Sequence, residues 1–250
     1  MSSGNILVDH QGTITTITFN RPDALNALEP AMVVEFLEIL REVDDEPTTR
    51  AVVLTGAGRA FCAGGDIKAF GTSPDTRVHR RAWHLMYAML DFEKPIVAMV
   101  NGPALGLGLT VAQLCDAMVM AEDARLGDPH VDLGLVAGDG VAVVLPLLVG
   151  PHRAKELLLS GRLITGAEAL DMGIGNAVVP GDELADTAYR LAQTFADQPT
   201  YAARATKLLV NRYVRWMANE ILDTALAYEA ISRTLPEYPE AVAAWKERRV

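Results

Sequence analysis

Two glycine-rich segments constrain this chain most, because each lies between an apolar run and a helical pattern. Residues 59–68 read RAFCAGGDIK after the run 51–55, and residues 101–110 read NGPALGLGLT after the run 96–100. Glycine admits backbone conformations closed to other residues, and a helix start adds unpaired N–H groups at the positive end of its dipole. Two such turns can each aim one N–H at a single oxygen, which predicts an oxyanion hole.

The order of strands and helices around these segments predicts the fold class. The chain has 250 residues, half of them hydrophobic, which is enough for one large domain or a domain with an appendage. The apolar runs 51–55 and 96–100 suit strands buried on both faces. With helical patterns at about 75–92 and up to about 115, and a further strand at 117–120, they form a strand–helix repeat typical of an α/β fold.

The flanking regions have their own local signals. Alternation at 6–8 and 14–19 predicts a β-hairpin, and residues 31–43 after Pro30 have helical spacing. Residues 124–140 read as a loop, 141–160 as a helix, and Thr165 to Glu168 as a capping box. A last strand is expected at 176–179, followed by helices from 183 with breaks at Pro199, Pro236 and Pro239.

Composition excludes several classes of function. The net charge is -10 and the chain has no block of lysine or arginine, which disfavours nucleic acid as a partner. Two cysteines, Cys62 and Cys115, indicate reduced thiols rather than a disulfide scaffold. No signal peptide is expected, and no apolar stretch approaches the roughly 20 residues of a membrane span. We therefore expect a cytoplasmic protein.

The two glycine segments together resemble those of the enoyl-CoA hydratase/isomerase (crotonase) superfamily, and the likeness covers nearly the whole chain. The resemblance implies a spiral of ββα units in residues 1–190. It also implies a helical C-terminal region, residues 191–250, that forms trimers and covers the coenzyme A site. A homotrimer or a hexamer (a dimer of trimers) is then expected. The substrate would be a coenzyme A thioester, with no permanently bound cofactor.

The resemblance also assigns substrate contacts. Ala63 and Leu107 would donate their N–H groups to the thioester oxygen. Trp83 and Met86 would shape the acyl pocket. For Arg248 and Arg249, near the coenzyme A phosphates in the family, a solvated C-terminal helix is the alternative. The remaining positions expected to contact coenzyme A or the substrate are Ala24, Leu25, Asp66, Ile67 and Gly106.

The acid–base residues differ from the family pattern, because Thr110 and His130 occupy the positions of its two glutamates. The Thr110 hydroxyl stays neutral near pH 7, so either a packed helix residue or a water-holding role is open. His130 can act as acid or base near neutral pH. Asp139, nine residues on, is either a turn residue or a carboxylate that fixes the histidine tautomer. We predict His130 as general acid/base and Asp139 as its partner or a second base.

Other chemistries lack their sequence signals. The five histidines and two cysteines show no metal-ligand spacing, so no metal is predicted. The chain has no Gly-x-Ser-x-Gly elbow of a serine hydrolase. Neither glycine segment has the Gly-x-Gly-x-x-Gly pattern of a dinucleotide site.

The sequence thus favours an acyl-CoA enzyme that stabilises a thioester enolate and hydrates a 2-enoyl-CoA. One alternative is a carbon–carbon bond hydrolase or lyase of the same fold, since the spacing of His130 and Asp139 resembles the β-diketone hydrolase branch. Another is an acyl-CoA-binding protein with weak catalysis, because both family glutamates are absent. The acyl group is not specified by the sequence.

Overall fold

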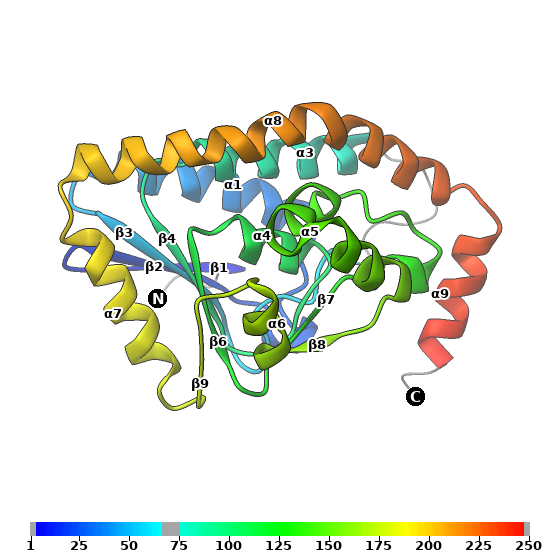
Figure 1. The fold of residues 1–250 in the computed structure, drawn as a ribbon, viewed down its shortest axis with the longest axis horizontal. Helices are drawn as coiled ribbons and strands as arrows, with labels where there is room; N and C mark the ends of the chain where they lie inside the picture. Colours follow the sequence, from blue (N-terminus) through cyan, green and yellow to red (C-terminus); the bar gives the residue numbers. More distant parts are fainter. Residues whose placement is uncertain (1–3, 67–75, 248–250) are drawn as a thin grey trace.

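A six-stranded sheet lies at the centre of the protein in the computed structural model, which describes residues 4–66 and 76–247 (Figure 1). The strand order is β1-β2-β3-β4-β6-β9. β1 and β2 form the predicted antiparallel hairpin around Gly12, and the other neighbours are parallel. The strands are β1 (Ile6–Gln11), β2 (Ile14–Phe19), β3 (Ala51–Gly56), β4 (Ile96–Val100), β6 (Ala117–Ala121) and β9 (Ala177–Val179).

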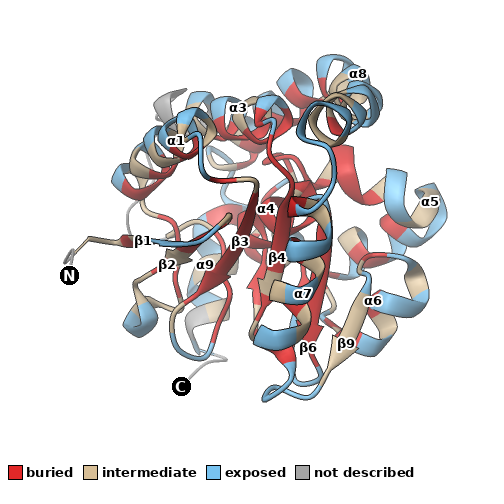
Figure 2. Ribbon diagram, turned by 90° about the vertical axis from the view of Figure 1, so that its left-hand side faces the viewer, coloured by how far each residue is buried: buried red, intermediate tan, exposed pale blue. Residues whose placement is uncertain are grey.

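Both faces of this sheet are covered, which explains the continuous apolar runs. In β3, Val52 and Leu54 face the main core, which α1 (Pro30–Asp45) and α3 (Thr76–Asp91) help to form. Ala51 and Val53 face the other side, where α7 (Leu184–Ala196) packs. Figure 2 shows the consequence: β3, β4 and β6 are buried along most of their length, with α7 in front of them.

The domain boundary predicted at residue 190 falls inside α7. Leu184, Ala188, Ala192 and Ala196 of this helix pack in one cluster with residues of β3, β4 and β6. Small residues at this spacing let the helix lie close to the strands. Since the whole helix belongs to the sheet, we propose that the core extends to residue 196 and that the C-terminal region begins at residue 200.

A second, three-stranded sheet was not predicted from the sequence. It consists of β5 (Ala104–Leu105), β7 (Arg125–Gly127) and β8 (Ile164–Thr165). Strands of two or three residues are too short to show an alternating pattern. Part of the expected loop at 124–140 is therefore a strand, and the second glycine segment (101–110) contains one.

The remaining core helices agree with the predicted patterns. The capping box is confirmed, because the Thr165 hydroxyl accepts the Glu168 N–H at 3.1 Å and the Glu168 carboxylate accepts the Thr165 N–H at 2.9 Å. The helix predicted at 141–160 is interrupted at Gly150 (φ 78°, ψ 158°). These helices are α4 (Leu107–Leu114), α5 (Val141–Ser160) and α6 (Gly166–Met172), with short 3₁₀ turns η1 (Pro22–Ala24) and η2 (Val131–Leu133).

The C-terminal region consists of α8 (Thr200–Ser232) and α9 (Glu237–Glu247). α8 lies along α3, and α9 turns back beside η2 (Figure 1). The predicted break at Pro239 is wrong: Pro239 lies in the first turn of α9, where a missing N–H costs no helical hydrogen bond. Across residues 4–66 and 76–247, no helix has the length and apolar composition needed to cross a bilayer.

Candidate active site

A cavity of about 560 Å³ brings together residues from six separate parts of the chain. The η1 turn, both glycine segments, His130 and Asp139 all contribute to its wall. α8 and α9 close it with residues that include Leu226, Tyr238 and Trp245. Tyr238 packs with Leu133 and Leu135, so α9 is fixed to the loop that follows His130.

The turn that carries Ala24 and Leu25 is held by Asn26. Leu25 and Asn26 both have positive φ values, 51° and 57°, and asparagine is one of the residues that tolerate this region. The Asn26 side chain is fully buried; its amide donates to the carbonyls of Ala57 (2.9 Å) and Ala60 (2.7 Å). These bonds fasten the turn to the first glycine segment (59–68), and Ala24 and Leu25 line the cavity as expected.

The oxyanion role predicted for Ala63 is not supported, because its N–H is already engaged. It donates to the Leu25 carbonyl at 2.9 Å. Leu28 then pairs with the same segment through its N–H to the Gly64 carbonyl, at 2.8 Å. Because of this pairing, the N–H of the next residue, Gly65, points away from Leu28. Within the described part of the chain, the Gly65 N–H has no acceptor. Gly65, not Ala63, supplies the unpaired donor on this side.

Leu107 supplies the second unpaired N–H, as predicted from the helix start. It is the first residue of α4, after Gly106 with φ 51° and ψ -124°. Among residues 4–66 and 76–247 no acceptor meets its N–H. A side chain at Gly64 would stand 2.8 Å from the Leu105 carbonyl and 3.6 Å from the Leu107 nitrogen. The two glycine segments therefore pack backbone to backbone, and both line the cavity.

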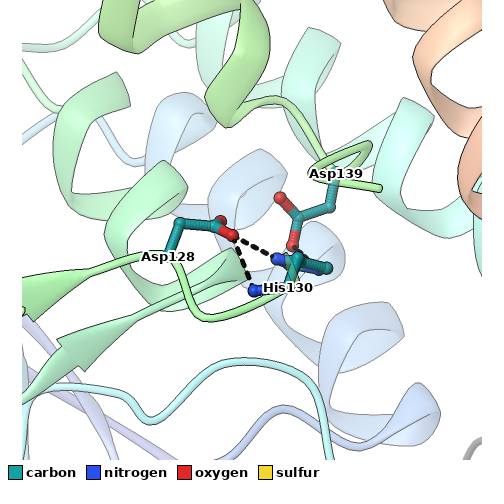
Figure 3. A group of neighbouring side chains, drawn as sticks. All are labelled: Asp128, His130 and Asp139. Atoms are coloured by element: carbon teal, nitrogen blue, oxygen red, sulfur yellow. Dashed lines mark hydrogen bonds and ion pairs between the residues drawn. The ribbon is translucent and has the colours of Figure 1, made fainter. Parts of the chain in front are cut away.

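His130 lies between two carboxylates (Figure 3). Its Nδ1 is 2.6 Å from Oδ1 of Asp128, which also accepts the His130 backbone N–H at 3.1 Å. Its Nε2 is 3.6 Å from Oδ2 of Asp139. Sequence reasoning missed Asp128, although an aspartate two residues before a backbone N–H is the pattern of an Asx-turn. His130 and Asp139, which we call the dyad, are brought together as predicted.

Thr110 lies behind Asp139 rather than on the cavity wall. Its hydroxyl is 3.3 Å from Oδ1 of Asp139 and 3.5 Å from the Gly106 carbonyl, and the side chain is buried. Its methyl group stands 2.8 Å from the Cβ position of Gly140, so that glycine is required there. Two roles were open for Thr110, a packed helix residue or a residue that holds water. These contacts agree with the packed helix residue, and the Thr110 hydroxyl also orients the Asp139 carboxylate.

The electrostatics of the dyad favour an ion pair. Burial alone would lower the pKa of His130, but the carboxylates of Asp128 and Asp139 outweigh it and raise the pKa to about 10. Burial raises the pKa of Asp139 to about 7, although His130 acts in the opposite direction. Between these values an imidazolium faces a carboxylate, and both are poised for proton transfer.

Asp128, His130 and Asp139 also have the composition of a cation site, since one ligand atom of each lies within 4.8 Å of the others. Sequence spacing did not reveal this group, because it is assembled from two loops. However, Nδ1 of His130 and Oδ1 of Asp128 already bond to each other at 2.6 Å. The charged imidazole pairs with both carboxylates, although Oδ2 of Asp128 is buried without a hydrogen-bond partner among the described residues. The ion-pair contacts therefore favour the acid–base interpretation.

Several predicted contact residues lie elsewhere. Trp83 is 37% exposed, and its ring packs on Tyr87 with centroids 4.4 Å apart, so it faces away from the cavity. Met86 is buried behind the wall with its sulfur 3.3 Å from the Cβ position of Gly140. Asp66 does line the cavity, as does Gly106. Ile67, Arg248 and Arg249 lie outside the described residues.

The cavity wall includes charged residues that the sequence did not single out. Four are arginines: Arg21, Arg59, Arg81 and Arg233. Glu229, 3% exposed, pairs with Arg233 at 2.6 Å on the last turns of α8. Their spacing of four residues is an ion-pair signal on a helix, but nothing in the sequence indicates that this helix end reaches the site.

Comparisons with known proteins agree with this geometry. The pattern described as "Enoyl-CoA hydratase/isomerase" matches residues 9–250. The short-chain-enoyl-CoA hydratase of Clostridium acetobutylicum is 35% identical over 234 residues, covering 92% of this chain and 88% of the relative. The 1,2-epoxyphenylacetyl-CoA isomerase of Escherichia coli is 32% identical over 243 residues, covering 94% and 93% respectively.

Solved structures are similar over nearly the full length. An enoyl-CoA hydratase/isomerase from Mycobacterium paratuberculosis has a TM-score of 0.90 and 36% identity, covering 96% of this chain and 98% of that one. OdaA of Pseudomonas aeruginosa has a TM-score of 0.85 and 32% identity, covering 97% and 99%. The predicted α/β fold of crotonase type is thereby confirmed.

Proposed function

The chain belongs to the enoyl-CoA hydratase/isomerase family of enzymes, and from this we propose that it hydrates a 2-enoyl-CoA through a stabilised thioester enolate. One observation carries the proposal. The His130–Asp139 dyad borders the same cavity as two backbone N–H groups, of Gly65 and Leu107, that have no acceptor in the described chain. Acid–base groups beside a ready-made oxyanion hole are the two requirements of enolate chemistry.

In this proposal the thioester oxygen accepts the N–H groups of Gly65 and Leu107. The coenzyme A arm runs past Ala24, Leu25 and Asp66, which line the cavity on the side of the η1 turn. Arg59, exposed on the same side, is a candidate partner for its phosphates. Ile67, Arg248 and Arg249 remain proposed contacts. The reaction needs only the thioester and water, so we propose no permanently bound cofactor.

The dyad can complete a balanced hydration. The Asp139 carboxylate takes a proton from water, whose oxygen bonds to Cβ of the enoyl group while the π electrons move onto the thioester oxygen. The His130 imidazolium then protonates Cα, and the enolate returns to a thioester. His130 is left neutral and Asp139 protonated. The pair is restored by a proton transfer from Oδ2 of Asp139 to Nε2 of His130; these atoms are 3.6 Å apart, so the transfer runs through one water or after the two groups approach.

Carbon–carbon bond hydrolysis is the second candidate. The observation that favours it is Thr110, which places a neutral, buried hydroxyl where family hydratases have a glutamate. The same dyad could activate water toward the ketone carbonyl of a β-diketone. An acyl-CoA-binding protein with weak catalysis is the third candidate, since the two N–H groups can hold a thioester without acid–base help.

Hydration of crotonyl-CoA, followed as loss of the conjugated enoyl absorbance, tests the proposal. Equilibrium binding of butyryl-CoA, which cannot react, is measured in parallel. We expect binding and turnover together. Binding without turnover of crotonyl-CoA or longer 2-enoyl-CoA thioesters would contradict hydration. Cleavage of a cyclic β-diketone by the same sample would then establish the second candidate, and failure of both reactions the third.

The pH dependence of the reaction follows from the charged dyad. Activity needs the Asp139 carboxylate, so kcat/KM should rise as pH increases through about 7. Activity also needs the His130 imidazolium, so kcat/KM should fall as pH increases through about 10. Asp139→Asn should lower kcat/KM over the whole pH range, because it removes the base. Asp128→Asn should move the alkaline limb to lower pH, since it removes a carboxylate that raises the His130 pKa. An alkaline limb unmoved by that change would contradict the assignment.

We also propose that the chain assembles as a homotrimer or a hexamer through its C-terminal region. Supporting this, α8 exposes large apolar side chains at helical spacing on its outer face: Leu209, Tyr213 and Trp216 are 63%, 72% and 65% exposed. Apolar patches of this kind usually mark contacts with another chain.

A further inference from the structure

The four arginines of the cavity wall differ in their partners. Arg21 pairs with Asp66 at 3.1 Å and with Glu29 at 3.8 Å, and Arg233 pairs with Glu229 at 2.6 Å. Arg59 and Arg81 make no hydrogen bond or ion pair with any residue in the described ranges 4–66 and 76–247. Within these ranges, the guanidinium groups of Arg59 and Arg81 therefore have no anionic partner and can bind an anion of a ligand.

These two arginines lie at different parts of the cavity. Arg59 is exposed and follows Gly58, whose Cβ position is 3.1 Å from Pro22 at the η1 turn. Ala24 and Leu25 lie on that side, so Arg59 belongs to the part of the cavity proposed to bind the coenzyme A arm. Arg81 is on α3 beside Ala82, which also lines the cavity.

Arg81 belongs to the dyad side of the cavity. Ala82 and Met86 are one helical turn apart and share a face of α3. The Met86 sulfur lies 3.3 Å from the Cβ position of Gly140, the residue that follows Asp139. α3 therefore passes the loop that carries the dyad. From this we infer that Arg81 and Ala82, which line the cavity, lie beside the space that the far end of the acyl group would occupy.

Among the described residues, the ion-paired carboxylates of the cavity and the dyad all have cationic partners other than Arg81. Asp128 and Asp139 share the His130 imidazolium, Glu229 has Arg233, and Asp66 has Arg21. Arg81 is only partly exposed, and a charge withdrawn from water is costly unless it is paired. A guanidinium forms its strongest hydrogen bonds, two in parallel, with a carboxylate.

We propose that Arg81 binds a carboxylate at the far end of the acyl group, so that the preferred substrates are coenzyme A monothioesters of dicarboxylic acids. The inference rests on the proposed function only in taking this cavity as the acyl-CoA site. It names the acyl class that the sequence left open, and it does not depend on which reaction follows enolate formation.

Binding of unreactive saturated thioesters tests Arg81 without relying on turnover. We compare glutaryl-CoA with butyryl-CoA by calorimetry on the wild type, and expect glutaryl-CoA to bind about 10-fold tighter or more, as one charge-assisted pair predicts. Arg81→Gln should abolish this preference, and Arg81→Lys should restore part of it. Arg80→Gln is the matched control, because Arg80 is the exposed neighbour on the same helix and does not line the cavity.

Each other outcome overturns the inference. Equal affinities of the wild type for the two thioesters would show that no carboxylate is recognised. If Arg81→Gln weakened glutaryl-CoA, butyryl-CoA and free coenzyme A alike, Arg81 would be a phosphate contact. Failure of the proposed hydration is a separate result: neither crotonyl-CoA nor glutaconyl-CoA would react, yet the glutaryl preference and its loss in Arg81→Gln would persist.

Discussion

Leu107→Pro should slow turnover about 100- to 1000-fold, the usual cost of losing one oxyanion donor. Proline has no N–H, so this substitution deletes the proposed donor itself. Steady-state kinetics with crotonyl-CoA, or with glutaconyl-CoA if the dicarboxylic preference is found, measure the effect. The loss should be in kcat, with a smaller change in the affinity for saturated thioesters, because the donor interacts most strongly with the enolate.

The helix should tolerate this substitution. Leu107 is the first residue of α4, where proline is favoured and no helical hydrogen bond is lost. Proline also restricts the preceding residue to extended conformations. Gly106, at φ 51° and ψ -124°, has the mirror image of a polyproline conformation, which glycine can adopt.

Leu107→Ala is the matched control, since it shortens the same side chain and keeps the N–H. We expect it to retain most of the wild-type kcat. If Leu107→Pro were folded and turned over within a few-fold of Leu107→Ala, the Leu107 N–H would have no part in the reaction.

His130→Ala should lower kcat by about 100- to 10,000-fold, the range for loss of a general acid or base. Among the described residues, the His130 imidazolium is the only cation that forms ion pairs with both Asp128 and Asp139. Its loss removes the proton donor to Cα and also the charge that keeps Asp139 ionised. Crotonyl-CoA turnover and butyryl-CoA binding are measured together, and binding should change far less than kcat.

His84→Ala is the control for this substitution, because His84 is exposed on α3 and outside the cavity. Removing His130 also leaves two buried carboxylates without their cation, so the unfolding free energy of the variant should be checked by urea titration. If the alanine variant does not fold, His130→Gln replaces it, because the glutamine amide keeps a hydrogen-bond donor of similar reach but cannot act as an acid or base. Turnover of a folded His130 variant within a few-fold of wild type would contradict the acid–base assignment.

The sequence was most informative where patterns are long. Strands β3, β4 and β6 are apolar on both faces because α7 covers one side and the main core the other, and that burial is visible as continuous runs. The three short strands of the second sheet carry no such pattern. The sequence placed the first unpaired N–H at Ala63, two residues before Gly65, which we propose as the donor. The sequence could not show this, because which N–H groups of a loop are unpaired depends on the segment that the loop pairs with. Here the partner is the η1 turn, whose Leu25 carbonyl takes the Ala63 N–H.

Only those site residues could be predicted that a family position or a spacing along the sequence indicates. His130 and Asp139 lie nine residues apart, and the structure joins them. Glu229 and Arg81 come from the end of α8 and the first half of α3, and only tertiary packing places them at one cavity. Asp128 comes from a turn and lies behind His130, to which it is hydrogen-bonded. Trp83 has the composition of a pocket residue, but the rotation of α3 turns it outward toward Tyr87.

Deuterium uptake at Cα of butyryl-CoA in D₂O tests the central claim most directly, because it reports enolate formation without depending on the acyl group or the later steps. Mass spectrometry of the recovered thioester gives the exchange rate. We expect exchange with the wild type and with His84→Ala, and its near loss with Leu107→Pro and His130→Ala. A wild type that binds butyryl-CoA yet exchanges no deuterium would contradict an enolate held by the Gly65 and Leu107 N–H groups and protonated by the dyad.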